Sequence, residues 1–246
     1  MSGIVRSQFN PVSWFWAIRP FSLGASIVPV VVGTSVALSA SKINWTLFIL
    51  ALLGSILIQI GTNLTDEYKD HQVSGKASKY PAPHKVIARG LLSENAVAVG
   101  IILAFSIATV IGLYIVSQTG WEILVIGFTG IAVAYFYSAG PYPIGNLGLG
   151  EIIVFLSMGP TMVLAAFFVQ TGTFTWPVLL ISLPIGLTVT AIMHCNNLRD
   201  IDEDKLQHKR TIAVFLGWEH GRYFYAALLL SNYVLISLFA ILEILP

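Results

Sequence analysis

Charged residues are scarce in this chain, and cysteine is almost absent. Only 10% of the 246 residues are Asp, Glu, Lys or Arg, whereas soluble domains carry about 25%. This scarcity excludes a soluble globular domain, a disordered chain and a nucleic-acid-binding protein, and the net charge of +1 gives no reason to expect a polyanionic partner. Cys195 is the single cysteine, so neither an intrachain disulfide nor a cysteine-based zinc site is available.

Long apolar runs make up most of the sequence, which is 56% hydrophobic with a mean hydropathy of +0.80. A helix needs about 20 apolar residues to cross the bilayer core. The runs without charged residues are 20–41, 43–65, 95–121, 123–150, 152–198 and 223–242, and a Gln, Thr, Gly and Pro-containing turn at 170–177 divides the fifth. We expect an all-α fold, a polytopic transmembrane helical bundle of about seven spans, with residues 1–246 forming a single domain.

The basic residues predict the orientation of this bundle in the lipid bilayer. With the N-terminus in the cytoplasm, 12 of the 13 Lys and Arg residues fall on the inner side, and Lys42 is the exception. The two charged inner loops, 66–94 and 199–222, hold most of the side chains capable of chemistry. We therefore expect an integral membrane protein with its functional site at the cytoplasmic face.

Two matched acidic motifs end the second and sixth predicted spans. Both read Asn-x-x-Asp-x-x-x-Asp, and they consist of Asn63, Asp66 and Asp70, and of Asn197, Asp200 and Asp204. Offsets of 0, 3 and 7 place three side chains on one face of a helix. Because both spans run from outside to inside, we expect the two motifs to reach the same membrane level and to face each other.

Carboxylate and amide oxygens are ligands that suit Mg²⁺, which binds one or two carboxylates together with phosphate oxygens. Nearby cations can neutralise the remaining phosphate charge, and they include Lys85, Arg89, Arg199 and Lys209. A diphosphate alone does not need seven spans, whereas a prenyl diphosphate has a tail that fits among apolar helices. The simpler alternative is that these acids and bases are solvated residues at span ends. Two motifs with the same spacing argue against this alternative.

Several stretches of the sequence resemble one family of membrane enzymes. They are 18–23 (Ile-Arg-Pro-Phe-Ser-Leu), 86–93, 137–143, 148–151, 159–160, 169–172, 196–204 (Asn-Asn-Leu-Arg-Asp-Ile-Asp-Glu-Asp) and 209–217. Together they resemble the UbiA superfamily of aromatic prenyltransferases, and within it the 1,4-dihydroxy-2-naphthoate polyprenyltransferase branch. The resemblance covers most of the chain, although Asp66-Glu67 stands where family members often carry Asn-Asp.

This resemblance implies a central cavity that opens near the cytoplasmic side and a Mg²⁺-dependent transfer of a polyprenyl group to an aromatic ring. In the naphthoate branch this step belongs to menaquinone biosynthesis. By motif match, Asp66, Asp70, Asp200 and Asp204 would hold the magnesium–diphosphate, supported by the two asparagines Asn63 and Asn197. The family usually has nine helices, so its C-terminal helix pair is expected to be absent here.

Four other residues near the inner side are notable, and two of them, both tyrosines, have two interpretations each. Tyr135 and Tyr137 can shield a developing allylic cation, or they belong to an aromatic belt at the membrane interface. His194 lies one helical turn from the end of the second motif's span, beside that motif. Glu151 reads as an acid in the first turn of a helix, where the helix dipole favours a negative charge.

Other functions stay open at this point. The acceptor could be another one, such as 4-hydroxybenzoate, homogentisate or a glycerol phosphate ether lipid. A membrane carrier usually places an ionisable residue deep within a span, whereas every acid here lies at a span end or beyond. A phospho-alcohol transferase would carry its aspartates in a single run of sequence, whereas here they form two distant motifs. A non-catalytic membrane scaffold would not need two matched sets of carboxylates. The sequence leaves the prenyl chain length, the oligomeric state and a general base undetermined.

Overall fold

The computed structural model describes residues 10–74, 83–140 and 142–244, and within these ranges every regular element is a helix. The expected all-α class is therefore confirmed. In chain order the elements are α1 (Pro11–Ile18), η1 (Pro20–Ser22), α2 (Gly24–Ala37), α3 (Trp45–Ser74), α4 (Glu94–Thr119), α5 (Trp121–Ser138), η2 (Ile144–Asn146), α6 (Gly150–Leu156), η3 (Ser157–Thr161), α7 (Met162–Thr171), α8 (Trp176–Arg199), α9 (Ile201–Leu206) and α10 (Ile212–Ile241).

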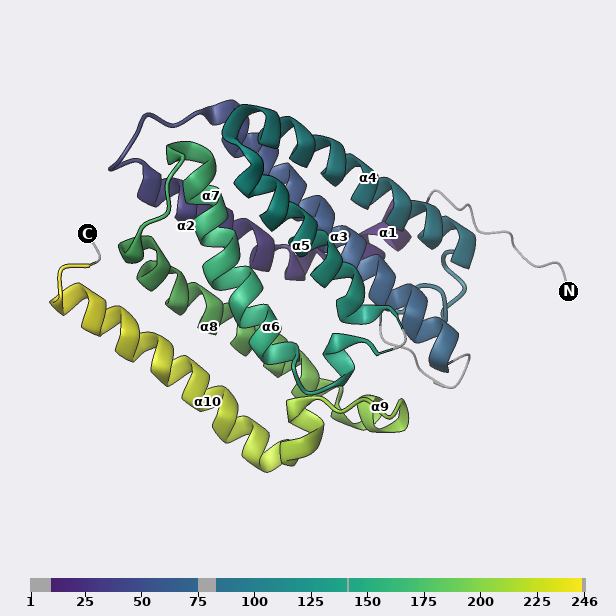
Figure 1. The fold of residues 1–246 in the computed structure, drawn as a ribbon. Coiled ribbons are helices and arrows are strands. Elements are labelled where there is room, and N and C mark those ends of the chain that lie inside the picture. The colour runs from purple at the N-terminus through teal and green to yellow at the C-terminus, as the bar shows by residue number, and fades with distance from the viewer. Residues whose placement is uncertain (1–9, 75–82, 141, 245–246) are drawn as a thin grey trace, which may run out of the picture.

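Six helices are long and apolar enough to cross a membrane, and a bent pair brings the number to seven. The pair consists of Pro11–Ser22 and Gly24–Ala37, which meet at an angle of 50°. The first member of this pair is itself interrupted at Arg19, which lies between α1 and η1, has a left-handed backbone conformation and precedes a proline. The seven expected spans are thus found when this bent pair counts as one (Figure 1).

The fifth expected run folds as two antiparallel spans, as its turn signal predicts. The first combines α6, η3 and α7, where Pro160 lies inside the π-helical turn η3. Proline lacks a backbone N–H, and a wider turn accommodates the missing hydrogen bond. Beside it, a Cβ built on Gly159 would lie 2.6 Å from the Cα of Gly186, so these two glycines let η3 and α8 touch.

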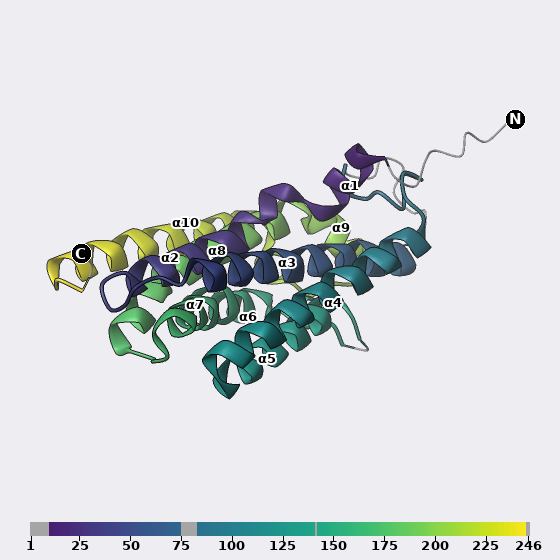
Figure 2. The same cartoon turned by 90° about the horizontal axis from the view of Figure 1, so that it is seen from above.

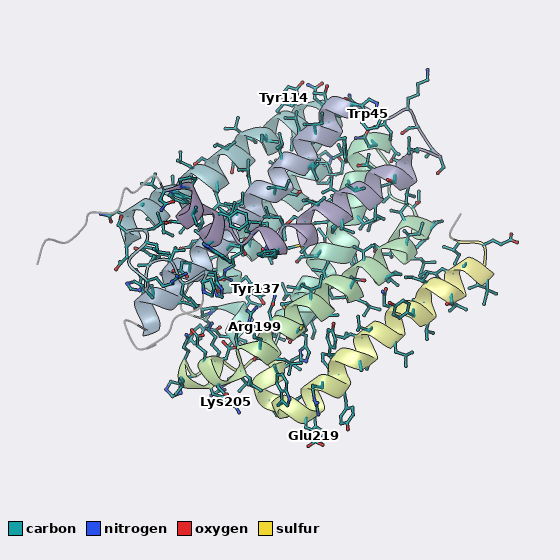
Figure 3. The ribbon with its side chains drawn as sticks, turned by 180° about the vertical axis from the view of Figure 1, so that it is seen from behind. Trp45, Tyr114, Tyr137, Arg199, Lys205 and Glu219 are labelled. Atoms are coloured by element: carbon teal, nitrogen blue, oxygen red, sulfur yellow. The ribbon has the colours of Figure 1, made fainter. Side chains whose placement is uncertain are left out.

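The helices lie side by side, with α4 and α5 on one flank of the bundle and α10 on the opposite flank next to α8 (Figure 2). Large apolar side chains are exposed around the outside, as expected for helices that face lipid; examples are Val110, Leu230 and Tyr233. In Figure 3, Trp45 and Tyr114 lie at one end of the bundle, whereas Tyr137, Arg199 and Lys205 lie toward the other. The two acidic motifs are found at this second end, where α3 and α8 both finish.

Candidate active site

A large cavity of about 1470 Å³ joins the polar end of the bundle to its apolar interior. Its walls come from α2, α3, α4, α5, α7 and α8. Deep in the bundle the lining is apolar and includes Ile111, Ile123 and Val169. At the other end all four motif aspartates line the cavity. A ligand with an anionic head and a long apolar tail fits such a space.

The first motif lies on the unbroken helix α3, so its three side chains share one helix face as expected. Asn63 is buried and donates to the carbonyl oxygen of Ile18 and to Ser22 Oγ, both at 2.8 Å. Asp66 pairs with Arg19, whose Nη1 lies 2.8 Å from Oδ2. Asp70, one turn further on, pairs with two lysines that are described below.

The second motif does not lie on one helix, contrary to the expectation. Asn197 belongs to α8, but α8 ends at Arg199, and Asp204 belongs to the separate short helix α9. Asp200 stands at the junction and accepts hydrogen bonds from the guanidinium of its neighbour Arg199 at 2.6 and 2.7 Å. The chain thus turns at Asp200, and the spacing of 0, 3 and 7 alone did not reveal this break.

Two lysines connect the two motifs across the mouth of the cavity. Lys209 Nζ lies 3.1 Å from Asp70 Oδ1 and 3.5 Å from Asp204 Oδ1. Lys85 Nζ contacts Asp70 Oδ2 and lies 3.8 Å from Glu203 Oε1. Although burial opposes their charge, the neighbouring aspartates hold the pKa of both lysines above its ordinary value. Both ammonium groups are therefore charged at neutral pH.

Burial acts in the opposite direction on an acid. It raises the pKa of Asp204 to about 6, although the charge of Lys209 opposes this shift. His84 also lines the cavity, and burial together with the charges of Arg19 and Lys85 lowers its pKa to about 3. The imidazole of His84 is thus neutral at pH 7, and the positive charge at the cavity mouth comes from lysine and arginine.

Ten of the twelve predicted site residues line the cavity. Besides the four aspartates, they are Asn63, Lys85, Tyr137, Asn197, Arg199 and Lys209. The other two lie elsewhere: Arg89 donates to the carbonyl oxygen of Pro83 at 3.0 Å, and Tyr135 is 43% exposed on the outside of α5. Tyr135 and Tyr137 therefore differ, because only Tyr137, whose hydroxyl lies 3.0 Å from Met193 Sδ, can contact a ligand in the cavity.

Sequence reasoning gave no role to Arg19, which lies on the cavity wall. Its Nη1 pairs with Asp66, whereas Nε and Nη2 are buried and have no hydrogen-bond partner among the described residues. A guanidinium with two free donors is suited to bind a planar carboxylate in a bidentate manner. The signal available in the sequence was the unusual position of an arginine directly before an apolar span.

Glu67 and Glu151 are two further acids whose surroundings the sequence did not reveal. Glu67 is 1% exposed and accepts a hydrogen bond of 2.9 Å from the backbone N–H of Ile87, which ties the loop after α3 to that helix. Glu151 lies in the first turn of α6 as expected, but it is 3% exposed and contacts His194, which is fully buried. Its interpretation as a simple dipole-stabilised acid is therefore incomplete.

The donor set at the cavity mouth fits Mg²⁺. Within the described ranges no group of three or more His, Cys, Asp or Glu side chains is arranged to hold a metal on its own. Mg²⁺ does not require such a cage, since it is usually bound by one or two carboxylates, with waters and phosphate oxygens completing the octahedron. Asp70 and Asp204 already share one cation, the ammonium of Lys209, so carboxylates of both motifs can approach a single positive centre.

The fold and the cavity define a polytopic helical membrane protein with two aspartate motifs at the mouth of an elongated apolar cavity. The profile of the UbiA prenyltransferase family matches residues 26–246. The chain belongs to this family, as its motifs suggested.

Curated relatives agree with this membership, and a solved structure has a similar fold. The chain is 36% identical over 199 residues to the 1,4-dihydroxy-2-naphthoate octaprenyltransferase of Bacillus subtilis, covering 81% of this chain and 64% of that protein. The Mycobacterium leprae protein of the same name is 31% identical over 222 residues, covering 90% of this chain and 75% of its own length. The fold is similar to the structure of a UbiA homolog from Archaeoglobus fulgidus bound to GPP and Mg²⁺, with a TM-score of 0.68, 15% identity and coverage of 91% and 76%.

Proposed function

We propose that this chain transfers a polyprenyl group from a prenyl diphosphate to an aromatic acceptor in a Mg²⁺-dependent reaction. The observation that carries the proposal is the meeting of both aspartate motifs, with Lys85 and Lys209, at the mouth of an apolar cavity. This arrangement offers carboxylates for a metal, cations for a diphosphate and an apolar space for a prenyl tail. The homologous structure that contains GPP and Mg²⁺ supports the same assignment.

The residues of this chain have distinct parts in that reaction. Asp66, Asp70, Asp200 and Asp204 would hold Mg²⁺, which when bound neutralises the diphosphate and makes it a better leaving group. Lys85, Lys209 and Arg199 meet the charge that develops on the departing diphosphate. The ring of Tyr137, on the cavity wall, can stabilise positive charge on the allylic carbon, and the apolar walls exclude water as a competing nucleophile.

We further propose 1,4-dihydroxy-2-naphthoate as the acceptor, which would place the reaction in menaquinone biosynthesis. The two relatives named above act on this compound by name, and their likeness to the chain supports the choice. Arg19 gives a physical reason, because its Nε and Nη2, which have no partner in the described part of the chain, can bind the acceptor carboxylate beside Asp66. With the N-terminus in the cytoplasm, the cavity mouth would face the cytoplasmic side, where water-soluble substrates arrive.

Prenyl transfer in isolated membranes tests the proposal. Membranes from a host without its own naphthoate prenyltransferase receive 1,4-dihydroxy-2-naphthoate and a labelled prenyl diphosphate, with Mg²⁺ or with EDTA. We expect a product that requires Mg²⁺, that disappears in Asp70→Asn/Asp204→Asn and that persists in Asp202→Asn, an exposed acid on α9 used as the matched control.

Two other outcomes would change the proposal. Mg²⁺-dependent binding of the prenyl diphosphate without product would keep the diphosphate site and replace the acceptor, for example by 4-hydroxybenzoate. Neither product nor binding would contradict the transferase assignment and favour a membrane carrier.

A further inference from the structure

Beneath the second motif, a buried chain of polar groups links α6, α8 and α10. Glu151 Oε1 lies 3.0 Å from His194 Nδ1, and His194 Nε2 lies 3.1 Å from the carbonyl oxygen of Gly221. The same Oε1 accepts a hydrogen bond of 3.2 Å from Asn197 Nδ2. The glutamate and histidine side chains are 4% and 0% exposed. These hydrogen bonds therefore connect the interior of the bundle directly to Asn197, the first residue of the second motif.

Close packing of these helices does not need such groups. A Cβ built on Gly221 would lie 2.5 Å from Leu198 Cδ2, so α8 and α10 already touch through a small residue and an apolar side chain. An acid buried among apolar helices is costly unless it is paired, and such residues in membrane proteins are as a rule functional. Glu151 also retains Oε2, which is buried without a partner among the described residues. The cost of this arrangement suggests a purpose other than packing.

The hydrogen-bond directions indicate that purpose. The carbonyl oxygen of Gly221 can only accept, so His194 carries a proton on Nε2, and one further proton lies between Nδ1 and Glu151. Because Oε1 accepts from Asn197 in either case, the amide NH₂ of Asn197 is held toward Glu151. Its Oδ1 is then directed away from Glu151, and Asn197 lines the cavity beside Asp200 and Asp204.

In the first motif, neutral groups orient the amide of the corresponding asparagine, Asn63. The NH₂ of Asn63 is used by the Ile18 carbonyl and by Ser22, and its Oδ1 accepts from Gln59 at 3.3 Å. Asn197 has no such neutral partners, and among the described residues Glu151 is the one group to which its amide donates. An apolar side chain at 151 would leave the amide of Asn197 free to rotate.

We propose that Glu151, held by His194, is a positioning residue that fixes the amide of Asn197 and thereby sets the Mg²⁺ requirement of the second motif. This inference rests on the proposed function, because it concerns the same metal–diphosphate site. Glu151 is not part of the cavity lining, whereas Asn197 is, so Glu151 acts through Asn197. Outer partners that orient metal-binding groups usually contribute 10–100-fold to metal affinity.

The test is equilibrium binding of tritiated farnesyl diphosphate to the purified chain in detergent, as a function of Mg²⁺ concentration. In Glu151→Leu we expect the Mg²⁺ concentration for half-maximal binding to rise about tenfold. Glu151→Gln, which keeps an acceptor for Asn197, should recover most of that loss. Glu122→Leu is the matched control, since Glu122 is also the second residue of its helix, α5, but α5 begins away from the motifs and reaches Asp66 only at its other end, through Ser138.

A double-mutant cycle identifies the route of the effect. If Glu151 acts through Asn197, Asn197→Ala alone should raise the Mg²⁺ requirement as much as Glu151→Leu, and the double variant should show no further rise. Should Glu151→Leu fail to fold, His194→Phe removes the partner of Glu151 and should raise the requirement at least about threefold. A merely structural role gives another pattern, with a lower melting temperature and an unchanged Mg²⁺ requirement.

Two results would overturn the inference, and they differ from failure of the proposed function. One is a folded Glu151→Leu variant with the Mg²⁺ requirement of the wild type, and the other is additive losses in the double variant. A wild-type chain that shows no Mg²⁺-dependent binding would contradict the proposed function itself, and the inference with it.

Discussion

The two aspartate motifs have identical spacing but different structures. The first lies on one continuous helix, α3, and is fixed from three sides by Arg19, by Ser22 and by the loop that Glu67 holds. The second is divided by a turn at Asp200, and Asp204 is carried on the six-residue helix α9. The first motif is thus part of the rigid framework of the bundle, whereas the second is attached at a helix end.

This difference assigns unequal roles to aspartates that look equivalent in sequence. Asp70 contacts Lys85 and Lys209, and Lys209 also contacts Asp204 of the second motif. Asp200 pairs with its own neighbour, Arg199, whose side chain is 60% exposed. Exposed pairs of this kind contribute little, so Asp200 is free to exchange Arg199 for a ligand at small cost.

The most direct test of this difference between the motifs is to neutralise one aspartate of each. We expect Asp70→Asn to lower kcat for prenyl transfer by about 10²–10³-fold, because it removes a central charge from the site. Asp200→Asn should lower kcat by about tenfold, since this carboxylate lies at the edge of the cluster. Steady-state assays at saturating Mg²⁺ measure both effects, and Asp202→Asn serves as the control. Equal losses in the two variants would show that the motifs act alike despite their structures.

The next prediction concerns Arg19, which pairs with Asp66 of the first motif and which we propose binds the acceptor. We expect Arg19→Lys to raise KM for the naphthoate by about 10–100-fold, since hydrogen bonds to charged groups contribute about 1.5–3 kcal/mol. Lysine keeps a positive charge near Asp66 but lacks the planar fork. The measurement is KM for the acceptor at fixed prenyl diphosphate, together with binding of the prenyl diphosphate alone, which should change little. A loss confined to prenyl diphosphate binding would assign Arg19 to the diphosphate instead.

The sequence predicted the helices and ten of the residues that line the cavity, and the features it did not predict have physical causes. Apolar runs define spans because lipid requires them, and this constraint is independent of tertiary contacts. The turn at Asp200 depends on how α9 and the residues after it dock, with Lys209 paired to Asp70 of α3 and the backbone N–H of Arg210 bonded to the carbonyl oxygen of Asn146. The burial of Glu151 depends on His194, 43 residues away, and no local pattern reports such a contact. Arg89 and Tyr135 lie outside the cavity lining, which the sequence did not predict because charge and aromaticity do not tell which way a side chain points.

The second motif should also be the more sensitive of the two to pH. Burial raises the pKa of Asp204 to about 6, so this carboxyl is ionised at pH 7 and mostly protonated at pH 5 in the metal-free protein. Because Mg²⁺ must displace that proton, we expect its affinity to fall about tenfold over this range. Mg²⁺-dependent binding of farnesyl diphosphate, measured at pH 7 and pH 5, checks this. In the Asp204→Asn variant, any pH dependence that is left comes from protonation of the diphosphate ligand itself. If this variant has the same pH profile as the wild type, Asp204 is not the source of the pH dependence.

The last prediction concerns the rigidity of the first motif, which depends on a residue that no ligand touches. Glu67→Leu leaves the buried N–H of Ile87 without its acceptor, and such a loss costs about 1–3 kcal/mol of stability. Glu67→Gln keeps an acceptor oxygen and should be close to the wild type in a thermal unfolding experiment. Since the loop fastened at Ile87 also carries Lys85, Glu67→Leu should raise KM for the prenyl diphosphate a few-fold while kcat changes less. If Glu67→Leu melts like the wild type and keeps its KM, the loop is held by the buried Val86 and its apolar neighbours, and the first motif owes its rigidity to packing and not to this hydrogen bond.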